Sequence, residues 1–354
     1  MKNLPAMARF AGRLATGLLD VTHDPQALDS EGFWAVVADF EGRLTCARFR
    51  DVRPLPRRVG PRSRWSGPGR DAWTTSLDRD AYIEGVRRIR RHIAAGDVYQ
   101  ANLCRVLSAP LAADADLEAL ADRLTARHHA PYAGLVRLPA HGVEVVSASP
   151  ELFLRRRGPV VDSGPVKGTG RTEADLMEKD HAENVMIVDL VRNDLGRVCA
   201  TGSVTVPQLC AVEQHPGLVH LVSTVRGELR HGAGWADLLA ATFPPGSVTG
   251  APKEGALGII RALETAPRGP YCGGVGWVDA DRERGELAVG IRTFWTDRVR
   301  GRLNFGAGAG ITWGSDPVRE WEETELKASR LLHLASDGPK ELGAGPAPAP
   351  LTAR

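Results

Sequence analysis

The chain has 354 residues, enough for one large or two ordinary domains, and 43% of them are hydrophobic, so it can bury a sizeable core. Its formal net charge of +2 argues against a nucleic-acid-binding protein that depends on phosphate contacts, and no apolar run approaches the ~20 residues of a membrane span. The five cysteines form no C-x-x-C motif, which disfavours a disulfide framework or a zinc site.

The N-terminal third predicts short apolar segments, a long loop and one helix. Residues 1–5 lack the apolar region of a signal peptide, so we expect a cytoplasmic protein. The apolar run at 33–37 predicts a strand or a buried helix, and the Pro, Gly and Arg residues of 53–69 predict a long loop. Apolar residues then recur at helical spacing from Tyr82 to Ile93, which predicts a helix that begins near Asp78 or Asp80 and ends at Gly96.

The rest of the chain alternates between strands and helices. Strands are expected at 97–103, 133–138, 143–156, 219–228, 273–279, 286–296 and 302–307. Helices are expected around Leu117–Leu124, at 173–195, at 253–265 and from Asp316-Pro317 onward, the last after a turn at 308–310. The segment 337–354 is rich in Gly, Pro and Ala and predicts a disordered tail.

Lys167 is the centre of the most informative stretch, Ser163-Gly-Pro-Val-Lys-Gly-Thr-Gly170. Its Pro and Gly residues disfavour a helix and predict a tight turn. A lysine amine can act as a nucleophile when desolvation or neighbouring cations favour its free form. The alternative is a solvated loop lysine, which is the ordinary state of an isolated Lys-Gly pair.

Two pairs of carboxylates lie at helical spacing. Asp180 and Glu183 share one face of the predicted helix 173–195, and Glu320 and Glu323 share a face of the last helix, which Lys327 continues. All-oxygen ligands without His or Cys suit Mg²⁺, which keeps several waters and bridges to an anionic substrate. Either pair alone is more typical of a solvated helix face, so a metal site requires that both pairs meet in space.

Ordered motifs over about three quarters of the chain resemble the chorismate-utilising enzymes, in particular the branch of aminodeoxychorismate synthase component I. They are GDVYQ (96–100), SASPE (147–151), PVKGT (165–169), AENVMIVDLVRNDLG (182–196), HLVS (220–223), PGSVTGAPK (245–253), YCGG (271–274), IR (291–292), GAG (308–310) and EWEET (320–324). The resemblance implies a single α+β domain with two antiparallel sheets around a helical core. Residues 1–75 would form an N-terminal part of this fold, shortened relative to relatives, and 76–336 the chorismate-binding catalytic core.

The resemblance also assigns the site. It implies Mg²⁺ held by Glu183 and by Glu320 or Glu323, directly or through water, with Asp180 as the weakest of the four candidates. The implied contacts with chorismate are Gly168, Thr169, Ser247, Tyr271, Arg292, Gly308, Ala309, Gly310 and Lys327. An Arg fork, backbone N–H groups and a metal suit a substrate with two carboxylates.

Two positions separate the branches of the family. Isochorismate and salicylate synthases carry a lysine base where this chain has Gln100, and anthranilate synthases usually carry alanine where it has Lys167. In the aminodeoxychorismate branch the lysine is implied to attack C2 of chorismate and expel the C4 hydroxyl, with Glu151 as general acid/base. Ammonia then adds at C4 and gives 4-amino-4-deoxychorismate, a precursor of 4-aminobenzoate and folate. His220 matches a histidine linked to pyruvate elimination in the anthranilate branch, and a structural role is an equal alternative here.

The sequence also predicts how such a chain would obtain its ammonia. No cysteine lies in a G-x-C-x-G elbow, so ammonia is expected from a separate glutamine amidotransferase component II subunit or from solution. Two other functions stay open: an anthranilate synthase component I, and a non-catalytic paralogue that binds chorismate, since a fold does not fix a function.

Overall fold

A computed structural model of the chain describes residues 5–56, 65–128, 130–170, 172–215 and 218–337. Part of the predicted loop, residues 57–64, and the predicted tail from residue 338 onward lie outside these described residues. No helix in the described ranges is long and apolar enough to cross a membrane.

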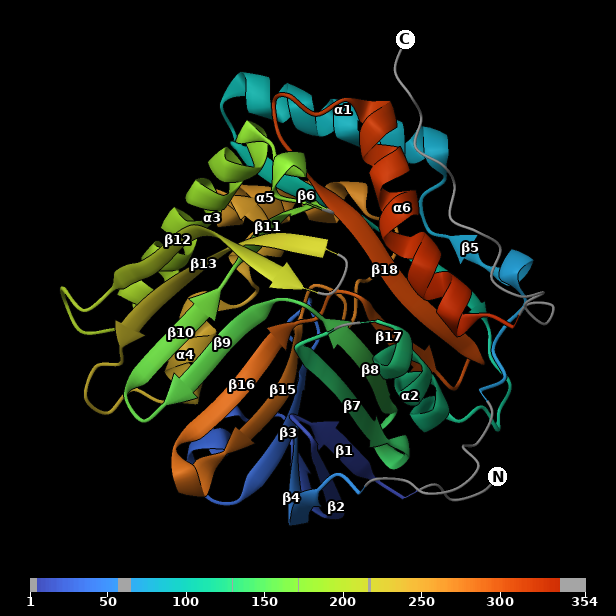
Figure 1. Cartoon of the computed structure of the whole chain (residues 1–354), viewed down its shortest axis with the longest axis vertical. Helices are drawn as coiled ribbons and strands as arrows, with labels where there is room; N and C mark the ends of the chain where they lie inside the picture. The colour runs from blue at the N-terminus through green and yellow to red at the C-terminus, as the bar shows by residue number, and fades with distance from the viewer. Residues whose placement is uncertain (1–4, 57–64, 129, 171, 216–217, 338–354) are drawn as a thin grey trace.

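The strands join into one continuous antiparallel ladder that doubles back on itself (Figure 1). Neighbour by neighbour it runs β5 (Thr74–Thr75), β6 (Gln100–Pro110), β18 (Arg302–Ile311), β17 (Thr293–Asp297), β8 (Val143–Ser149), β7 (Tyr132–Leu138), β1 (Met7–Phe10), β2 (Arg13–Thr22), β4 (Leu44–Pro54), β3 (Phe33–Ala38), β15 (Gly274–Asp279), β16 (Arg284–Val289), β9 (Leu152–Arg157), β10 (Val160–Gly164), β13 (Leu218–Glu228) and β12 (Thr205–His215). Two short strands are added to its ends: β11 (Val166–Gly170) pairs with β13, and β14 (Gly250–Ala251) pairs with β6.

Strand β3 shows why the ladder forms two packed layers. Successive side chains of a strand point to opposite faces. Phe33, Ala35 and Val37 belong to a core cluster made with β1, β7 and β15, so this face packs strand against strand. Trp34 and Val36 belong to a second cluster on the other face. Both faces are buried, and the predicted strand or helix at 33–37 is a strand.

The helices cover the outer faces of the layers. They are α1 (Arg79–Ala95), α2 (Leu117–Arg127), α3 (Glu178–Gly196), α4 (Trp235–Thr242), α5 (Lys253–Leu263) and α6 (Pro317–Ala335). Helix α3 packs on β11, β12 and β13, α2 packs on β7 and β8, and α1, α5 and α6 pack around β6 and β18 (Figure 1). The predicted α+β class with antiparallel sheets is confirmed.

Helix ends follow the capping residues in the sequence. The carboxylate of Asp78 accepts a hydrogen bond from the Ala81 N–H, and Gly96 ends α1 in the left-handed conformation with φ 84°. The start predicted for α3 is wrong by five residues, because 173–175 form a separate 3-10 turn. Asp180 explains the later start: its carboxylate accepts from the Met177 N–H and fixes the first turn of α3 there.

Candidate active site

Lys167 lies on strand β11, so the predicted tight turn is wrong. Lys167 is opposite Leu221 of β13, but the next pair is Thr169 with His220, which leaves Gly168 as a bulge. Gly168 has φ 74°, and a Cβ there would lie 3.0 Å from the Cβ of Asp180, so only glycine fits without strain. A bulge redirects the neighbouring side chain, and the Lys167 ammonium donates to the carbonyl of Ser247 at 3.2 Å.

Glu151 lies next to Lys167 in the interior. It is 4% exposed and directly precedes β9. Burial raises the pKa of Glu151 to about 7, against a hydrogen bond from Ser247 and the charge of Lys167, which both lower it. A carboxyl with a pKa near neutrality can give and take a proton at physiological pH. The structure therefore brings together three predicted site residues, Glu151, Lys167 and Ser247.

Arg292 faces the same carboxylate from the break between β16 and β17. It has φ 52°, a strained value for a side chain of this size, and this conformation divides the predicted strand 286–296 in two. Burial lowers the pKa of Arg292 and the charge of Glu151 opposes this shift. Its Nη1 lies 3.2 Å from Nε2 of His128, the residue that ends α2. No sequence pattern pointed to His128.

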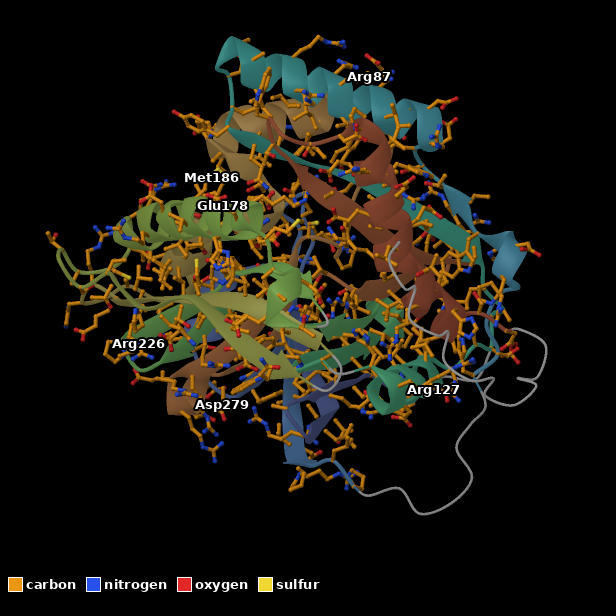
Figure 2. All side chains as sticks on the ribbon, turned by 45° about the horizontal axis from the view of Figure 1, so that its top comes forward. Arg87, Arg127, Glu178, Met186, Arg226 and Asp279 are labelled. Carbon is orange, nitrogen blue, oxygen red and sulfur yellow. The ribbon has the colours of Figure 1, made fainter. Side chains whose placement is uncertain are left out.

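The predicted carboxylates of α3 and α6 approach each other. Figures 1 and 2 show these two helices on either side of the central strands, with α3 labelled at Glu178 and Met186 in Figure 2. Burial raises the pKa of Glu183 on α3, and the charges of Asp180 and Glu323 raise it further. Burial likewise raises the pKa of Glu320, with Glu323 adding to the shift. Carboxylates that repel one another across two helices favour a cation between them.

Three lysines moderate this repulsion, and the charge of the first, Lys167, lowers the pKa of both Glu183 and Glu323. Burial alone would raise the pKa of Glu323, but Lys327, whose ammonium lies 2.7 Å from its Oε1, outweighs burial and lowers it. Lys179 also lowers the pKa of Glu183 and of Glu323. The sequence prediction missed Lys179, although its position four residues before Glu183 on the same helix was a usable signal.

The oxygen donors fit a magnesium ion that keeps much of its water. Within the described residues, no group of three or more His, Cys, Asp or Glu side chains is gathered closely enough to hold a metal ion. Mg²⁺ is usually bound through one or two carboxylates plus waters and substrate oxygens, without an enclosing cage of side chains. Glu183 on α3, together with Glu320 or Glu323 on α6, suits such a site. Asp180 is engaged as the cap of α3.

Gly308, Ala309 and Gly310 belong to β18, so the predicted turn at 308–310 is wrong. Gly308 is opposite Cys104 and Gly310 is opposite Asn102 in β6. A Cβ on Gly308 would lie 2.5 Å from the Cys104 sulfur, and one on Gly310 would lie 2.1 Å from Nε2 of Gln100. The glycines therefore let β18 lie close over β6, and the Gly308 carbonyl accepts from Lys327 at 3.1 Å.

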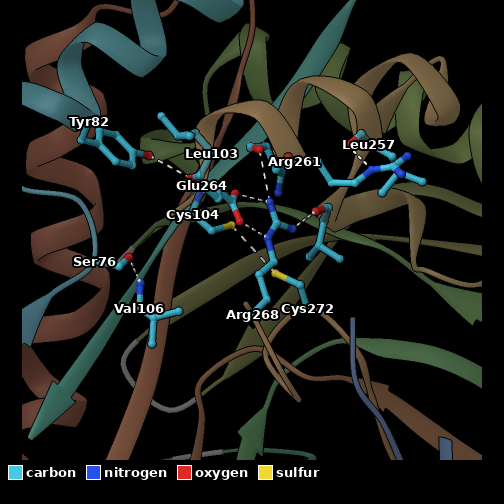
Figure 3. A network of polar contacts seen from close by, with 12 residues as sticks. Ser76, Tyr82, Leu103, Cys104, Val106, Leu257, Arg261, Glu264, Arg268 and Cys272 are labelled. Atoms are coloured by element: carbon cyan, nitrogen blue, oxygen red, sulfur yellow. Dashed lines mark hydrogen bonds and ion pairs between the residues drawn. The ribbon is translucent and has the colours of Figure 1, made fainter. Parts of the chain in front are cut away.

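A buried ionic network around Arg268 and Glu264 lies beside β6 (Figure 3), and Tyr271 follows Arg268 in the same loop. The Arg268 guanidinium donates to the carboxylate of Glu264 and to the carbonyl of Val248, and the same carboxylate accepts from the Cys104 N–H at 2.9 Å. The network ties the loop of Tyr271 to β6 and to the turn that carries Ser247. Burial raises the pKa of Tyr271 well above its usual value, so its hydroxyl stays protonated and able to donate.

His220 lies on β13, opposite Thr169 of β11 and Glu213 of β12. It is buried, at 4% exposure, and the side chain of Thr169 lies outside the described part of the site. The pairing register of the two strands thus places His220 beside β11, the strand that carries Lys167. Its catalytic or structural role remains a prediction.

The chain matches the chorismate binding enzyme family over residues 50–333. It is 40% identical over 271 residues to anthranilate synthase component 1 1 of Haloarcula marismortui, covering 73% of this chain and 54% of that protein. It is 38% identical over 275 residues to aminodeoxychorismate synthase component 1 of Klebsiella aerogenes, covering 74% and 59%. In fold it is similar to anthranilate synthase component I of Streptococcus pneumoniae, with a TM-score of 0.77, 22% identity and coverage of 94% and 93%.

The chain therefore belongs to the chorismate binding enzymes. Relatives with two different names match at similar identity, so the comparisons show the family and not one of the two named reactions. The chain spans little more than half the length of these two curated relatives.

Proposed function

We propose that the chain aminates chorismate to 4-amino-4-deoxychorismate, as an aminodeoxychorismate synthase component I. The observation that carries this proposal is the position of Lys167, whose amine lies at the Ser247 carbonyl beside the buried carboxyl of Glu151. A nucleophile and a proton donor within one small cluster are what displacement of a hydroxyl requires.

The substrate would be oriented by groups that recognise carboxylates and hydroxyls. Arg292 offers a guanidinium fork that stays protonated at any physiological pH. Tyr271 offers a protonated hydroxyl, and the Gly308–Gly310 stretch of β18 offers close backbone approach because its Cβ atoms are missing. Glu183 with Glu320 or Glu323 would hold Mg²⁺, which would neutralise a carboxylate of chorismate.

The chemistry divides between two residues. The free amine of Lys167 attacks C2 of the ring, the double bond shifts, and the C4 hydroxyl leaves as water with a proton from Glu151. Ammonia then attacks C4, the ring double bonds shift back, the Lys167 amine leaves C2, and the new C4 ammonium releases its extra proton to solvent. The sum is chorismate plus ammonia giving 4-amino-4-deoxychorismate plus water, with the enolpyruvyl group intact. Glu151 suits the acid role because its carboxyl is partly protonated near pH 7.

Ammonia would come from a glutamine amidotransferase component II subunit, and the product would serve 4-aminobenzoate and folate biosynthesis. The relative from Klebsiella aerogenes carries the name of this synthase component, which supports the assignment.

Anthranilate synthase component I is the second candidate. It is supported by the match with the relative from Haloarcula marismortui, which is as similar as the synthase relatives. In that reaction ammonia attacks C2 directly and pyruvate is lost, so a lysine amine at C2 would have no evident task.

Product analysis separates the two. The purified chain would be incubated with chorismate, Mg²⁺ and ammonium, and the products identified by mass spectrometry. We expect 4-amino-4-deoxychorismate with little pyruvate, and conversion to 4-aminobenzoate when an aminodeoxychorismate lyase is added. Anthranilate as the main product would refute the proposal in favour of the second candidate.

A further inference from the structure

A small cavity lies between Glu151, the turn that carries Ser247 and helix α3. Its volume is ≈ 20 Å³, and its lining includes Glu151, Ser163, Asp194, Thr242 and Ser247 among apolar residues of β9 and α3. A cavity of this size has room for about one water molecule, and a water needs two to four polar partners, which this lining supplies.

Asp194, which lines the cavity, forms a buried ion pair with Lys253. The Lys253 ammonium lies 2.6 Å from Oδ2 of Asp194 and donates to the carbonyl of Thr242 at 2.9 Å. Side-chain exposure is 6% for Asp194 and 16% for Lys253, so the lysine end alone approaches solvent. Burial raises the pKa of Asp194 and lowers that of Lys253, with Arg197 nearby also lowering the latter. A proton therefore moves between the two more readily than between exposed partners.

The pair is costly as a purely structural element. A buried ion pair gains little net stability over apolar residues of the same volume, because both charges lose their hydration. Lys253 is also the first residue of α5, where the positive end of the helix disfavours a cation. A function in proton transfer explains why these two groups adjoin the cavity of Glu151.

We propose that Asp194 and Lys253 return a proton to Glu151 through this cavity after each turnover. This relay rests on the proposed function, in which Glu151 gives its proton to the departing C4 hydroxyl. Glu151 carboxylate takes a proton from the water, the water takes one from Asp194, Asp194 takes one from the Lys253 ammonium, and Lys253 regains one from solvent. Lys167 and Arg292, the charged groups that face Glu151 from the other side, stay with the substrate.

Lys253→Arg tests the relay, because arginine keeps the charge pair with Asp194 but cannot release its proton. The rate of chorismate consumption is measured, whatever the product, together with chorismate affinity and thermal unfolding. We expect kcat to fall about tenfold to a hundredfold with KM within about twofold, and the solvent deuterium isotope effect on kcat to increase. Asp194→Asn, which keeps the volume and cannot carry a proton, is expected to do the same.

The matched control is Arg298→Lys at the buried pair of Arg298 with Glu144, which lies outside the cavity lining and should leave kcat unchanged. A folded Lys253→Arg or Asp194→Asn protein that consumes chorismate at the unmodified rate, with an unchanged isotope effect, would overturn the relay alone. A wild-type chain that binds chorismate but never consumes it would overturn the proposed function and the relay together.

Discussion

Lys167 and Glu151 are both positioned by one residue, Ser247. Its carbonyl accepts from the lysine ammonium and its side chain hydrogen-bonds the glutamate, so the short turn at 246–248 sets the relative position of the two groups. Replacing Lys167 removes the proposed nucleophile, and replacing Glu151 removes the proposed proton donor. The two replacements are therefore expected to change different measurements.

Lys167→Ala should abolish most amination, by on the order of a hundredfold or more, because no other amine of the cluster is placed for attack at C2. Chorismate should still bind, since Arg292 and Tyr271 do not depend on the lysine amine. The measurements are steady-state rates, and a mass increase on the Lys167 peptide after trapping the adduct in the wild type. Formation of 4-amino-4-deoxychorismate by the variant at the unmodified rate would disprove the covalent step.

The pKa of Glu151 predicts how kcat depends on pH. Its pKa, raised by burial to about 7, means that the carboxyl is protonated below pH 7 and ionised above it. Because the acid form donates the proton, kcat should decline as pH rises through about 7. Glu151→Gln should lower kcat by about a hundredfold and remove this basic limb. A pH–rate profile of both proteins checks the prediction, and an identical limb in the variant would assign the titration to another group.

At the scale of elements, the relative position of α3 and α6 is the feature that the sequence left open. Helical spacing placed Glu183 and Glu323 on helix faces, but only the packing of α3 on β11–β13 and of α6 on β18 brings their charges within range of each other. We expect chelation to abolish activity and Mg²⁺ to restore it. Glu183→Gln and Glu320→Gln should each lower activity by at least about tenfold while thermal unfolding stays cooperative.

The control for these two variants is Glu178→Gln, an exposed carboxylate on the same helix α3. It should keep full activity and an unchanged Mg²⁺ requirement. Full activity of the wild type in excess chelator would contradict the metal site altogether.

Elements with local signals were predictable, and those fixed by tertiary pairing were not. The ends of α1 follow from Asp78 and Gly96, which act within their own turn. Lys167 and Gly308 were placed in turns because glycine marks turns in most sequences. Here both glycine-rich segments are strands: the missing Cβ of Gly168 leaves room for Asp180 of α3, and those of Gly308 and Gly310 leave room for residues of β6. The break at Arg292 and the contact with His128 depend on packing between distant segments, which no local pattern carries.

At the scale of the whole molecule, the next prediction concerns which nitrogen donor supports the amination of chorismate. Ammonium should support turnover by the isolated chain, whereas glutamine alone should not, because the sequence contains no glutaminase elbow. Rates with each donor, measured by product formation, check this expectation. Turnover with glutamine by the purified chain would show that a glutamine-hydrolysing site exists within it.

The continuous ladder also has a consequence for how the chain reaches its folded state. Strand β3 pairs with β15, and β6 pairs with β18, so strands made early in synthesis must wait for partners made near the end. Folding dominated by such distant pairings is slow, because the entropy of closing long loops is lost before the contacts form. During this interval β3, apolar on both faces, is an open edge that other chains can join. We expect nascent chains stalled before residue 274 to aggregate or to recruit chaperones, and full-length chains to become protease-resistant only after β18 has emerged.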